Sequence, residues 1–207
     1  MKSKIVCLTQ ISTFAKKQKS IKVKVLIVDF YDSFTYNLAH YFEKLDCEVC
    51  VIRNDELDLS TIKFFDKLVL SPGPGLPKEK KNIFELLEQF NGKIPILGIC
   101  LGMQAIGEFV GGSIQNQSIV KHGLSEKITI SNTNCLFHSF PKSINVGLYH
   151  SWEVVNIPLE NISSTSENKV TMAIEFPKQK LYGLQFHPES ILTENGLALL
   201  RNFLNLN

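Results

Sequence analysis

A cysteine stands between two glycines in the stretch Gly98–Gly102, directly after the apolar run Ile94–Leu97. This spacing is typical of the sharp strand-to-helix turn on which hydrolases expose a nucleophile. Such a turn strains the backbone at Cys100, and a Cβ at either flanking position would crowd the neighbouring chain. Because Met103–Phe109 has the pattern of a helix, Cys100 is predicted to lie at a helix N-terminus, where the helix dipole favours a thiolate. On this feature alone, a buried structural cysteine is an equal alternative.

A second motif lies far downstream, at the end of a predicted buried strand over residues 181–186. His187 follows this strand directly, and Pro188 prevents the strand from continuing. A thiol nucleophile needs a general base, and that base needs an acceptor to fix its tautomer. Cys100, His187 and Glu189 can supply these three roles in that order. Taken singly, His187 is more typical of a turn and Glu189 more typical of a helix start than of a catalytic site.

Apolar runs and helical patterns alternate along the chain from Lys24 to Ile99. Strands are predicted at 25–28, 48–53, 67–70 and 94–99, and helices at 33–45 and 78–90. Beyond Phe109 the candidates are short strands between polar turns, at 113–116, 128–130, 146–149, 154–156 and 170–176. Strand 181–186 rejoins the sheet, and an amphipathic helix follows at 191–206. This order predicts an α/β fold with a doubly wound, mostly parallel central sheet flanked by helices, and a small antiparallel excursion.

Composition limits the functions that this chain can have. Its 207 residues suit one domain, and 44% hydrophobic with 20% charged residues is ordinary for a globular protein. A net charge of +2 and the lack of any nucleic-acid motif give no reason to expect a nucleic-acid partner. No apolar run approaches the length of a membrane span, so no membrane partner is expected. Five scattered cysteines form no disulfide framework, which favours a cytoplasmic protein.

Residues 1–23 differ from the rest of the chain, because they contain lysines but no acidic residue. They lack a clear signal-peptide core, and no arginine supports a transit peptide. We expect a disordered N-terminal extension or an upstream translation start, followed by one domain at 24–207. Cys47 and Cys50 have the spacing of half a zinc site, but no second ligand pair follows. They are interpreted as packing residues, and no metal site is expected.

Four motifs, in this order, resemble those of the class I glutamine amidotransferases, which use a Cys-His-Glu triad. The motifs are Asp29–Asn37, Leu70–Pro77, Gly98–Gln104 and Gln185–Ser190, and the resemblance spans about residues 24–206. The first two are similar to motifs of the glutaminase subunit of anthranilate synthase and of aminodeoxychorismate synthase. The resemblance implies that Cys100 attacks L-glutamine, with His187 as the base and Glu189 as its orienting acceptor.

The same resemblance implies a site for glutamine. The residues that it places against the substrate or the oxyanion are Gly73, Pro74, Gly75, Leu101, Gln104, Ser151 and Trp152. The amide of Gly73 or a neighbour, together with that of Leu101, would form the oxyanion hole. By composition alone, the loop at 71–75 is more typical of a rigid turn than of a binding loop. His150 is a competing candidate for the base, but it lacks the strand-end carboxylate that Glu189 offers His187.

Three positions depart from the family pattern. Phe30 stands where asparagine is common, Met103 where histidine or glutamine is frequent, and Trp152 where leucine is usual. Phe30 and Met103 do not belong to the triad, so we expect the chemistry to survive and their effect to fall on partner contacts. The substrate contact at Trp152 is expected to come mainly from the main chain.

Partners follow from the resemblance as well. The chain is too short for chorismate chemistry, so ammonia would pass to a separate chorismate-binding synthase subunit, in a heterodimer or heterotetramer. That subunit would hold Mg²⁺, whereas no cofactor is expected in this chain, and the expected partner face includes Tyr31–Asn37. The product would be anthranilate for tryptophan or 4-amino-4-deoxychorismate for folate. Two alternatives remain: a glutaminase serving another amidotransferase such as a nucleotide synthase, and a catalytically silent regulatory subunit.

Overall fold

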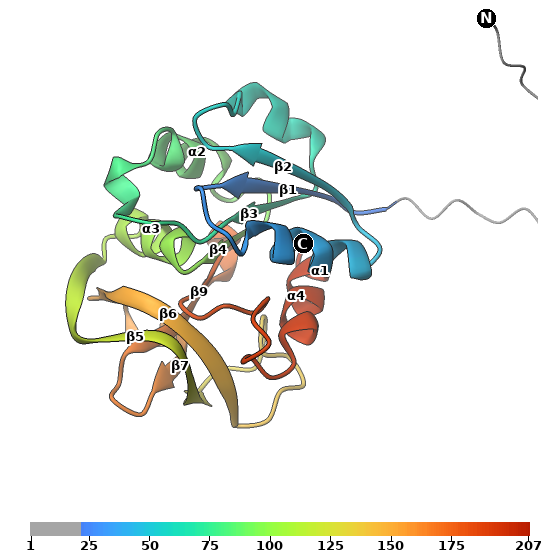
Figure 1. Cartoon of the computed structure of the whole chain (residues 1–207). Coiled ribbons are helices and arrows are strands. Elements are labelled where there is room, and N and C mark those ends of the chain that lie inside the picture. The colour runs from blue at the N-terminus through green and yellow to red at the C-terminus, as the bar shows by residue number, and fades with distance from the viewer. Residues whose placement is uncertain (1–21) are drawn as a thin grey trace, which may run out of the picture.

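The computed structural model describes residues 22–207, except for the side chains of 118–121. In this range one sheet of nine strands runs in the order β2-β1-β3-β4-β9-β8-β7-β5-β6 (Figure 1). The strands are β1 Lys24–Asp29, β2 Glu48–Arg53, β3 Lys67–Leu70, β4 Ile96–Ile99, β5 Ser113–Ile130, β6 Ser143–Val155, β7 Ile162–Ser166, β8 Thr171–Phe176 and β9 Leu181–Leu184. The α-helices are α1 Thr35–Lys44, α2 Ile83–Phe90, α3 Leu101–Phe109 and α4 Gly196–Leu204. Short 3₁₀ turns are η1 Leu59–Phe64, η2 Pro77–Glu79, η3 Leu159–Asn161 and η4 Pro177–Gln179.

The predicted N-terminal extension lies outside the described residues, apart from Lys22 and Val23. The Val23 carbonyl accepts a hydrogen bond from the Glu48 amide at 2.9 Å, and the Val23 side chain packs against the core. The Lys22 ammonium lies 2.5 Å from the Asp46 carboxylate. The packed body of the protein therefore includes the last two residues of the predicted extension.

The first half of the sheet is parallel and buried on both faces. β1 pairs with β2 and β3, β3 with β4, and β4 with β9, all in parallel. Side chains alternate along a strand, so Val25 and Ile27 join one core while Leu26 and Val28 join the other. Helices α1 and α4 cover the first of these faces, and α2 and α3 cover the second (Figure 1). This arrangement confirms the predicted doubly wound α/β fold.

The second half of the sheet is antiparallel; the strand predicted at 170–176 is confirmed as β8, but the other four predicted short strands were wrong in their bounds. β5 spans 18 residues and joins the predicted strands at 113–116 and 128–130, while β6 spans 13 residues and joins those at 146–149 and 154–156. Their pairing shifts register between Asn116 and Lys121 and again between His122 and Leu124. Such irregularities break the alternating pattern without ending the strand, which is why the sequence suggested separate pieces.

Strand β7 was not predicted, because four of its five residues are serine or threonine. Ser163, Ser164 and Ser166 are nevertheless buried between β5 and β8. Backbone pairing with two neighbours stabilises this strand where its side chains give little hydrophobic signal.

Two helices begin five residues later than predicted. The helix expected at 78–90 starts at Ile83, because Asn82 has a left-handed φ of 64° and η2 is a separate turn before it. The terminal helix starts at Gly196 rather than Ile191, after Asn195 with a φ of 56°. Left-handed residues cannot continue an α-helix, so each of these asparagines sets the boundary.

Candidate active site

Cys100 lies on a sharp turn between β4 and α3. Its φ of 50° and ψ of −102° are values that non-glycine residues rarely adopt. The Cys100 amide donates to the Leu184 carbonyl of β9 at 2.7 Å, which anchors the turn to the neighbouring strand. A Cβ on Gly98 would collide with the backbone of Gly102, and a Cβ on Gly102 would collide with the Leu70 carbonyl. The turn therefore requires both glycines, as a strained turn that presents a nucleophile does.

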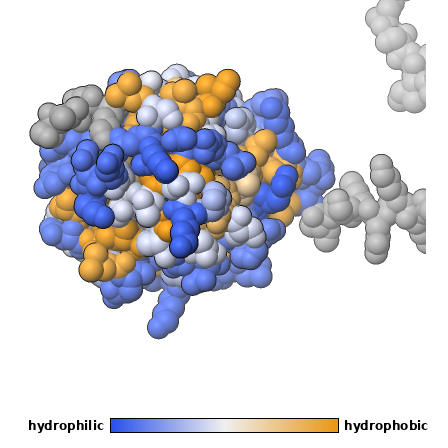
Figure 2. Space-filling view, turned by 90° about the horizontal axis from the view of Figure 1, so that it is seen from below, coloured by the Kyte–Doolittle hydropathy of each residue, from blue (hydrophilic) through white to orange (hydrophobic). Residues whose placement is uncertain are grey.

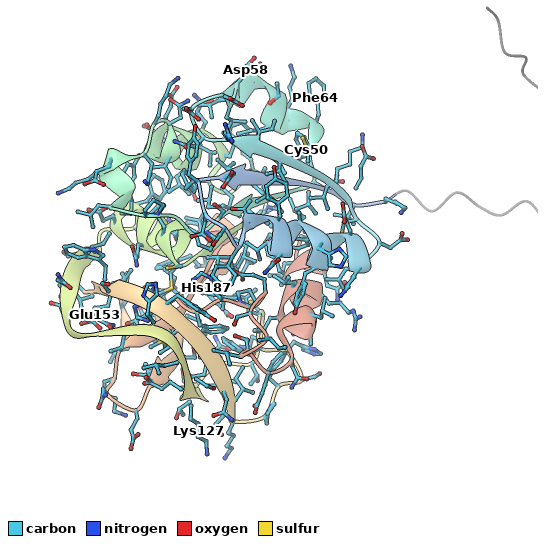
Figure 3. All side chains as sticks on the ribbon, viewed as in Figure 1. Cys50, Asp58, Phe64, Lys127, Glu153 and His187 are labelled. Atoms are coloured by element: carbon cyan, nitrogen blue, oxygen red, sulfur yellow. The ribbon has the colours of Figure 1, made fainter. Side chains whose placement is uncertain are left out.

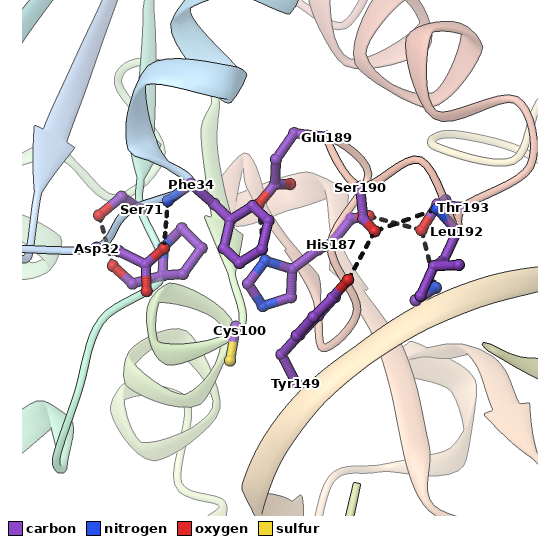
Figure 4. Close-up of polar contacts among 12 residues, drawn as sticks. Asp32, Phe34, Ser71, Cys100, Tyr149, His187, Glu189, Ser190, Leu192 and Thr193 are labelled. Carbon is purple, nitrogen blue, oxygen red and sulfur yellow. Dashed lines mark hydrogen bonds and ion pairs between the residues drawn. The ribbon is translucent and has the colours of Figure 1, made fainter. Parts of the chain in front are cut away.

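His187 and Glu189 lie in the loop that follows β9, and both are buried. His187 Nδ1 is 2.7 Å from Glu189 Oε1, and because a carboxylate only accepts, Nδ1 carries a proton. The His187 amide donates to the Gly147 carbonyl at 3.2 Å, and the His187 carbonyl accepts from the Thr193 hydroxyl at 2.6 Å. Figure 4 shows the imidazole with Glu189 at one end and Cys100 toward the other. The structure thus brings the three triad candidates together.

The charge state of His187 follows from its surroundings. Burial alone would lower the pKa of the imidazole, but interactions with Cys100 and Glu189 outweigh burial and raise the pKa to about 10. Nε2 is buried without a close hydrogen-bond partner among the described residues, so it is available to the Cys100 sulfur and to a substrate. A protonated imidazole beside a thiol stabilises the thiolate, which is the nucleophilic form.

Two aromatic rings enclose the His187 imidazole (Figure 4). The Phe34 ring centroid lies 5.2 Å from that of His187, and the Tyr149 centroid lies 5.0 Å from it. Both rings meet the imidazole at steep angles, 63° and 68°, a favourable edge-to-face geometry. The enclosure fixes the ring plane and shields the bond to Glu189 from water.

A cavity of about 510 Å³ opens beside Cys100, within the size range of small-molecule sites. Six of the seven residues predicted to bind substrate line it: Gly73, Pro74, Gly75, Gln104, Ser151 and Trp152. The seventh, Leu101, is the first residue of α3, so its amide lies at the helix N-terminus next to the nucleophile. Figure 3 shows His187 between the parallel half of the sheet and β6.

A model of the family described as "Glutamine amidotransferase class-I" matches residues 26–206. This chain belongs to the class I glutamine amidotransferases. Among its relatives, anthranilate synthase component 2 of Pyropia yezoensis is 43% identical over 186 residues, covering 87% of this chain and 98% of the relative. Aminodeoxychorismate synthase component 2 of Escherichia coli is 40% identical over 186 residues, covering 87% of this chain and 99% of the relative.

A solved structure agrees with the fold of this amidotransferase. It is described as a candidate GMP synthase subunit from Thermoplasma acidophilum and matches with a TM-score of 0.81 at 26% sequence identity. The match covers 89% of this chain and 94% of that one. The α/β architecture is therefore that of the family, including the mixed sheet.

Gln185 is a residue of the amidotransferase site to which the motifs gave no role. Its Nε2 lies 3.7 Å from the Cys100 sulfur, and its Oε1 accepts from Gln104 Nε2 at 3.4 Å. Gln104 also donates to the Trp152 carbonyl at 3.2 Å, so a chain of amides links the sulfur to β6. The signal was a polar residue inside the predicted apolar strand 181–186, because a fully buried amide needs hydrogen-bond partners.

His150, the competing candidate for the base, lies on β6 and lines the same cavity. Its Nδ1 is 3.0 Å from the Trp152 carbonyl, and since a carbonyl only accepts, this nitrogen carries the proton. A backbone carbonyl thus orients His150, whereas a buried carboxylate orients His187 and stabilises its charged form. This difference favours His187 as the base.

The remaining sequence features concern metals and membranes. Among residues 22–207, no group of three or more His, Cys, Asp or Glu side chains is placed to hold a metal ion. Cys47 and Cys50 are free thiols, one buried and one half-buried.

No helix in the described range is long and apolar enough to cross a bilayer. On the face seen in Figure 2, hydrophobic residues form separate patches among hydrophilic ones.

Proposed function

We propose that this chain is the glutaminase subunit of a chorismate-using synthase. It hydrolyses L-glutamine and delivers the ammonia to a separate large subunit. The observation that carries the proposal is the buried His187–Glu189 pair beside the Cys100 turn, at the end of a cavity lined by Gly73–Gly75. The names of two relatives, which this chain matches over nearly their whole length, support a partner of the anthranilate synthase or aminodeoxychorismate synthase type.

The first half of the reaction forms a thioester. The Cys100 thiolate attacks the side-chain carbonyl carbon of glutamine, and the carbonyl oxygen takes up the negative charge. The Leu101 amide and an amide of the Gly73–Gly75 loop donate to this oxygen, and each donor of this kind contributes about 3 kcal/mol. His187 gives its Nε2 proton to the leaving nitrogen as the carbon–nitrogen bond breaks. Ammonia and a glutamyl thioester on Cys100 result.

The second half releases glutamate. Neutral His187 now accepts a proton from water through Nε2, and the water oxygen attacks the thioester carbon. The carbon–sulfur bond breaks, glutamate leaves, and the pair of thiolate and imidazolium is restored. Throughout, Glu189 holds Nδ1 and stabilises the charged imidazole, as the acceptor in such a triad does.

The proposed partner face includes Tyr31–Asn37, whose first four residues line the active-site cavity. Tyr36 and Ile191 carry large hydrophobic side chains with exposed fractions of 70% and 96%. Ile191 also lines a second cavity of about 330 Å³, together with Asn37 and Glu189. Exposed hydrophobic side chains gathered beside a site are typical of an interaction surface. The partner is the chorismate-binding subunit, with Mg²⁺ in its own site, in a heterodimer or heterotetramer of the cytoplasm.

A glutaminase for nucleotide synthesis is the second candidate. The structural neighbour with a TM-score of 0.81 is described as a candidate GMP synthase subunit, which favours this class. That neighbour is 26% identical to this chain, whereas the relatives with chorismate-related names are 40% and 43% identical. The chorismate assignment is therefore preferred.

The test uses the large subunit that co-purifies with the full chain from its native source. Glutamate release is measured with the chain alone, with the partner, and with the partner and chorismate. We expect slow release from the chain alone and an increase of about tenfold or more with the chorismate-loaded partner. Mass spectrometry then identifies the amine as anthranilate or 4-amino-4-deoxychorismate. Ammonia transfer into neither compound would contradict the chorismate assignment, and no glutamate release in any mixture would contradict the glutaminase.

A further inference from the structure

The turn that follows β1 touches both halves of the active site. Within residues 29–35, one side chain packs against the oxyanion loop and another packs against the catalytic imidazole. We propose that Asp29, at the end of β1, is a positioning residue. It holds the oxyanion loop and the catalytic imidazole in a fixed position relative to each other. This inference rests on the proposed glutaminase function, because it assigns Asp29 a role in that reaction.

The Asp29 carboxylate is buried and organises the turn from one oxygen. Its Oδ1 accepts from the Tyr31 amide at 2.9 Å, from the Asp32 amide at 3.3 Å and from the Thr35 hydroxyl at 2.8 Å. Tyr31 has a φ of 66°, a left-handed conformation that costs a non-glycine residue free energy. Hydrogen bonds to a carboxylate are stronger than hydrogen bonds between neutral groups, so Asp29 can hold this strained turn.

One arm of the turn leads to the oxyanion loop. The Phe30 amide donates to the Ser71 hydroxyl at 2.9 Å, and that hydroxyl donates to the Pro72 carbonyl at 2.6 Å. Phe30 lies directly against Gly73, since a Cβ on Gly73 would sit 2.7 Å from the Phe30 Cβ and 2.8 Å from its carbonyl oxygen. The loop that carries the proposed oxyanion donor therefore takes its position from Phe30.

The other arm leads to the base. Phe34 immediately precedes Thr35, whose hydroxyl binds Asp29, and the Phe34 ring covers the His187 imidazole at 5.2 Å between centroids. Figure 4 shows the Phe34 ring beside the His187 imidazole. A shift of the turn would thus move the oxyanion donor and the base relative to each other. Displacements of about 1 Å are enough to lower a catalytic rate strongly.

The experiment compares Asp29→Ala and Asp29→Asn with Asp58→Ala in the full chain. Asp58 is a matched control, because its carboxylate accepts from the Ser60 amide in a similar turn, far from His187 (Figure 3). We expect Asp29→Ala to lower kcat about tenfold or more with KM changed less than about threefold, since positioning acts on the transition state. Asp29→Asn, which keeps an acceptor oxygen, should recover part of the loss. Asp58→Ala should retain kcat within about twofold.

Two further variants separate the arms. Thr35→Val removes the bond on the side of the base, and Ser71→Ala removes the bond on the side of the oxyanion loop. The rate at which iodoacetamide alkylates Cys100 at neutral pH, followed by mass spectrometry, reports the pairing of thiolate and imidazolium without glutamine or a partner. We expect Thr35→Val to lower this rate about twofold or more, because a less constrained imidazole stabilises the thiolate less. Ser71→Ala should lower kcat and leave the alkylation rate unchanged.

The proposal is overturned if folded Asp29→Ala keeps kcat within twofold of wild type, or if Thr35→Val leaves the rate of Cys100 alkylation unchanged. If Asp29→Ala does not fold, Asp29→Asn and Thr35→Val decide the question in the same way. A wild-type chain whose Cys100 is alkylated rapidly but that releases no glutamate would contradict the proposed function and leave the alkylation test of Asp29 intact.

Discussion

The parallel strands carry their site residues at strand ends, whereas the antiparallel half carries its residues along a strand. Cys100 follows β4, His187 follows β9, and Gly73 lies in the loop after β3. By contrast, the residues 149–152 that face the cavity lie within β6. The strand-end residues sit in short turns whose backbone is fixed by hydrogen bonds, by left-handed conformations or by glycines that accept no side chain.

This difference separates the residues that take part in the reaction from those that shape the cavity wall. The reacting atoms need positions set to a fraction of an ångström, and backbone-fixed turns provide this. The β6 wall contributes through side chains and through carbonyls such as that of Trp152, which accepts from Gln104. A strand can exchange a side chain without moving its backbone, so the departure from leucine at Trp152 is compatible with an intact triad. Changes in the parallel half should therefore have larger effects on the reaction than changes in the antiparallel half.

The largest expected effect comes from exchanging a cysteine in each half. Cys100→Ser should lower glutamine-dependent product formation at least about 10³-fold, because the alcohol is a far weaker nucleophile. Synthesis from free ammonia by the partner should stay near wild type, since ammonia bypasses this subunit. Cys135→Ser changes a half-buried thiol before β6 and should keep full activity. Residual glutaminase activity near wild type in Cys100→Ser would contradict the mechanism.

A second comparison adds one methyl group in each half. Gly102→Ala places a Cβ against the Leu70 carbonyl, which belongs to the backbone of β3 and cannot yield, so we expect a loss of about 3 kcal/mol in stability. In Gly123→Ala the nearest atom is a Tyr149 ring carbon at 4.0 Å, and only the φ of 68° opposes a side chain. This costs about 1 kcal/mol. Urea unfolding measures both, and equal losses would remove the contrast between the halves.

The two halves also differ in how far the sequence predicted them. Continuous apolar runs such as Val25–Val28 occur in buried parallel strands, so β1, β3 and β4 were correctly placed. Glycine spacing similarly indicated the turn at Cys100, because only a crowded backbone requires glycines there. In the antiparallel half, register shifts made β5 and β6 look like separate short strands. The polar sequence of Ile162–Ser166 gave no strand signal, so β7 was not predicted. Local pattern cannot reveal strands that depend on pairing between distant segments.

The candidate site shows the same limit. Motifs identified the candidate nucleophile and the candidate base, because cysteine and histidine are residue types that commonly take part in catalysis. Gln185, Phe34 and Asp29 were missed as contributors, since a glutamine, a phenylalanine and an aspartate acquire a role only through what they contact. The Gln185–Cys100 distance of 3.7 Å and the Phe34–His187 distance of 5.2 Å arise from segments far apart in the chain. Sequence spacing carries no information on such contacts.

A third prediction compares two exposed hydrophobic side chains. Ile191 lies in the loop after β9 with an exposed fraction of 96%, and Leu159 lies after β6 with 84%. Ile191→Asp should weaken the affinity for the partner about tenfold, because it places a charge in the proposed partner face. Leu159→Asp should bind as wild type does. Isothermal titration with the purified partner measures both, and equal binding of the two variants would contradict the proposed face.

The smallest effect concerns one buried carboxylate in the antiparallel half. Burial raises the pKa of Glu175 on β8 above its ordinary value, although the Leu136 amide donates to Oε1 at 3.0 Å. The folded state therefore binds this proton more readily than the unfolded state, so the Glu175 contribution to stability falls as pH rises above the unfolded pKa. Glu175→Gln keeps the acceptor for Leu136 and removes the titration. We therefore expect the variant to become more stable relative to wild type as pH rises above the unfolded pKa of a glutamate.

Glu194, in the loop after β9, is the matched control of opposite sign. Hydrogen bonds from the Asn145 amide and side chain lower the pKa of Glu194, so its contribution is present above the unfolded pKa and is lost as pH falls. Glu194→Gln should therefore lose stability at pH 8 and little at pH 3, the reverse of Glu175→Gln. Melting temperatures measured from pH 3 to pH 8 test whether the two variants change stability in opposite directions. If both variants followed the wild-type curve in parallel, neither carboxylate would titrate differently in the folded and unfolded states, and burial on β8 would carry no pH-dependent cost.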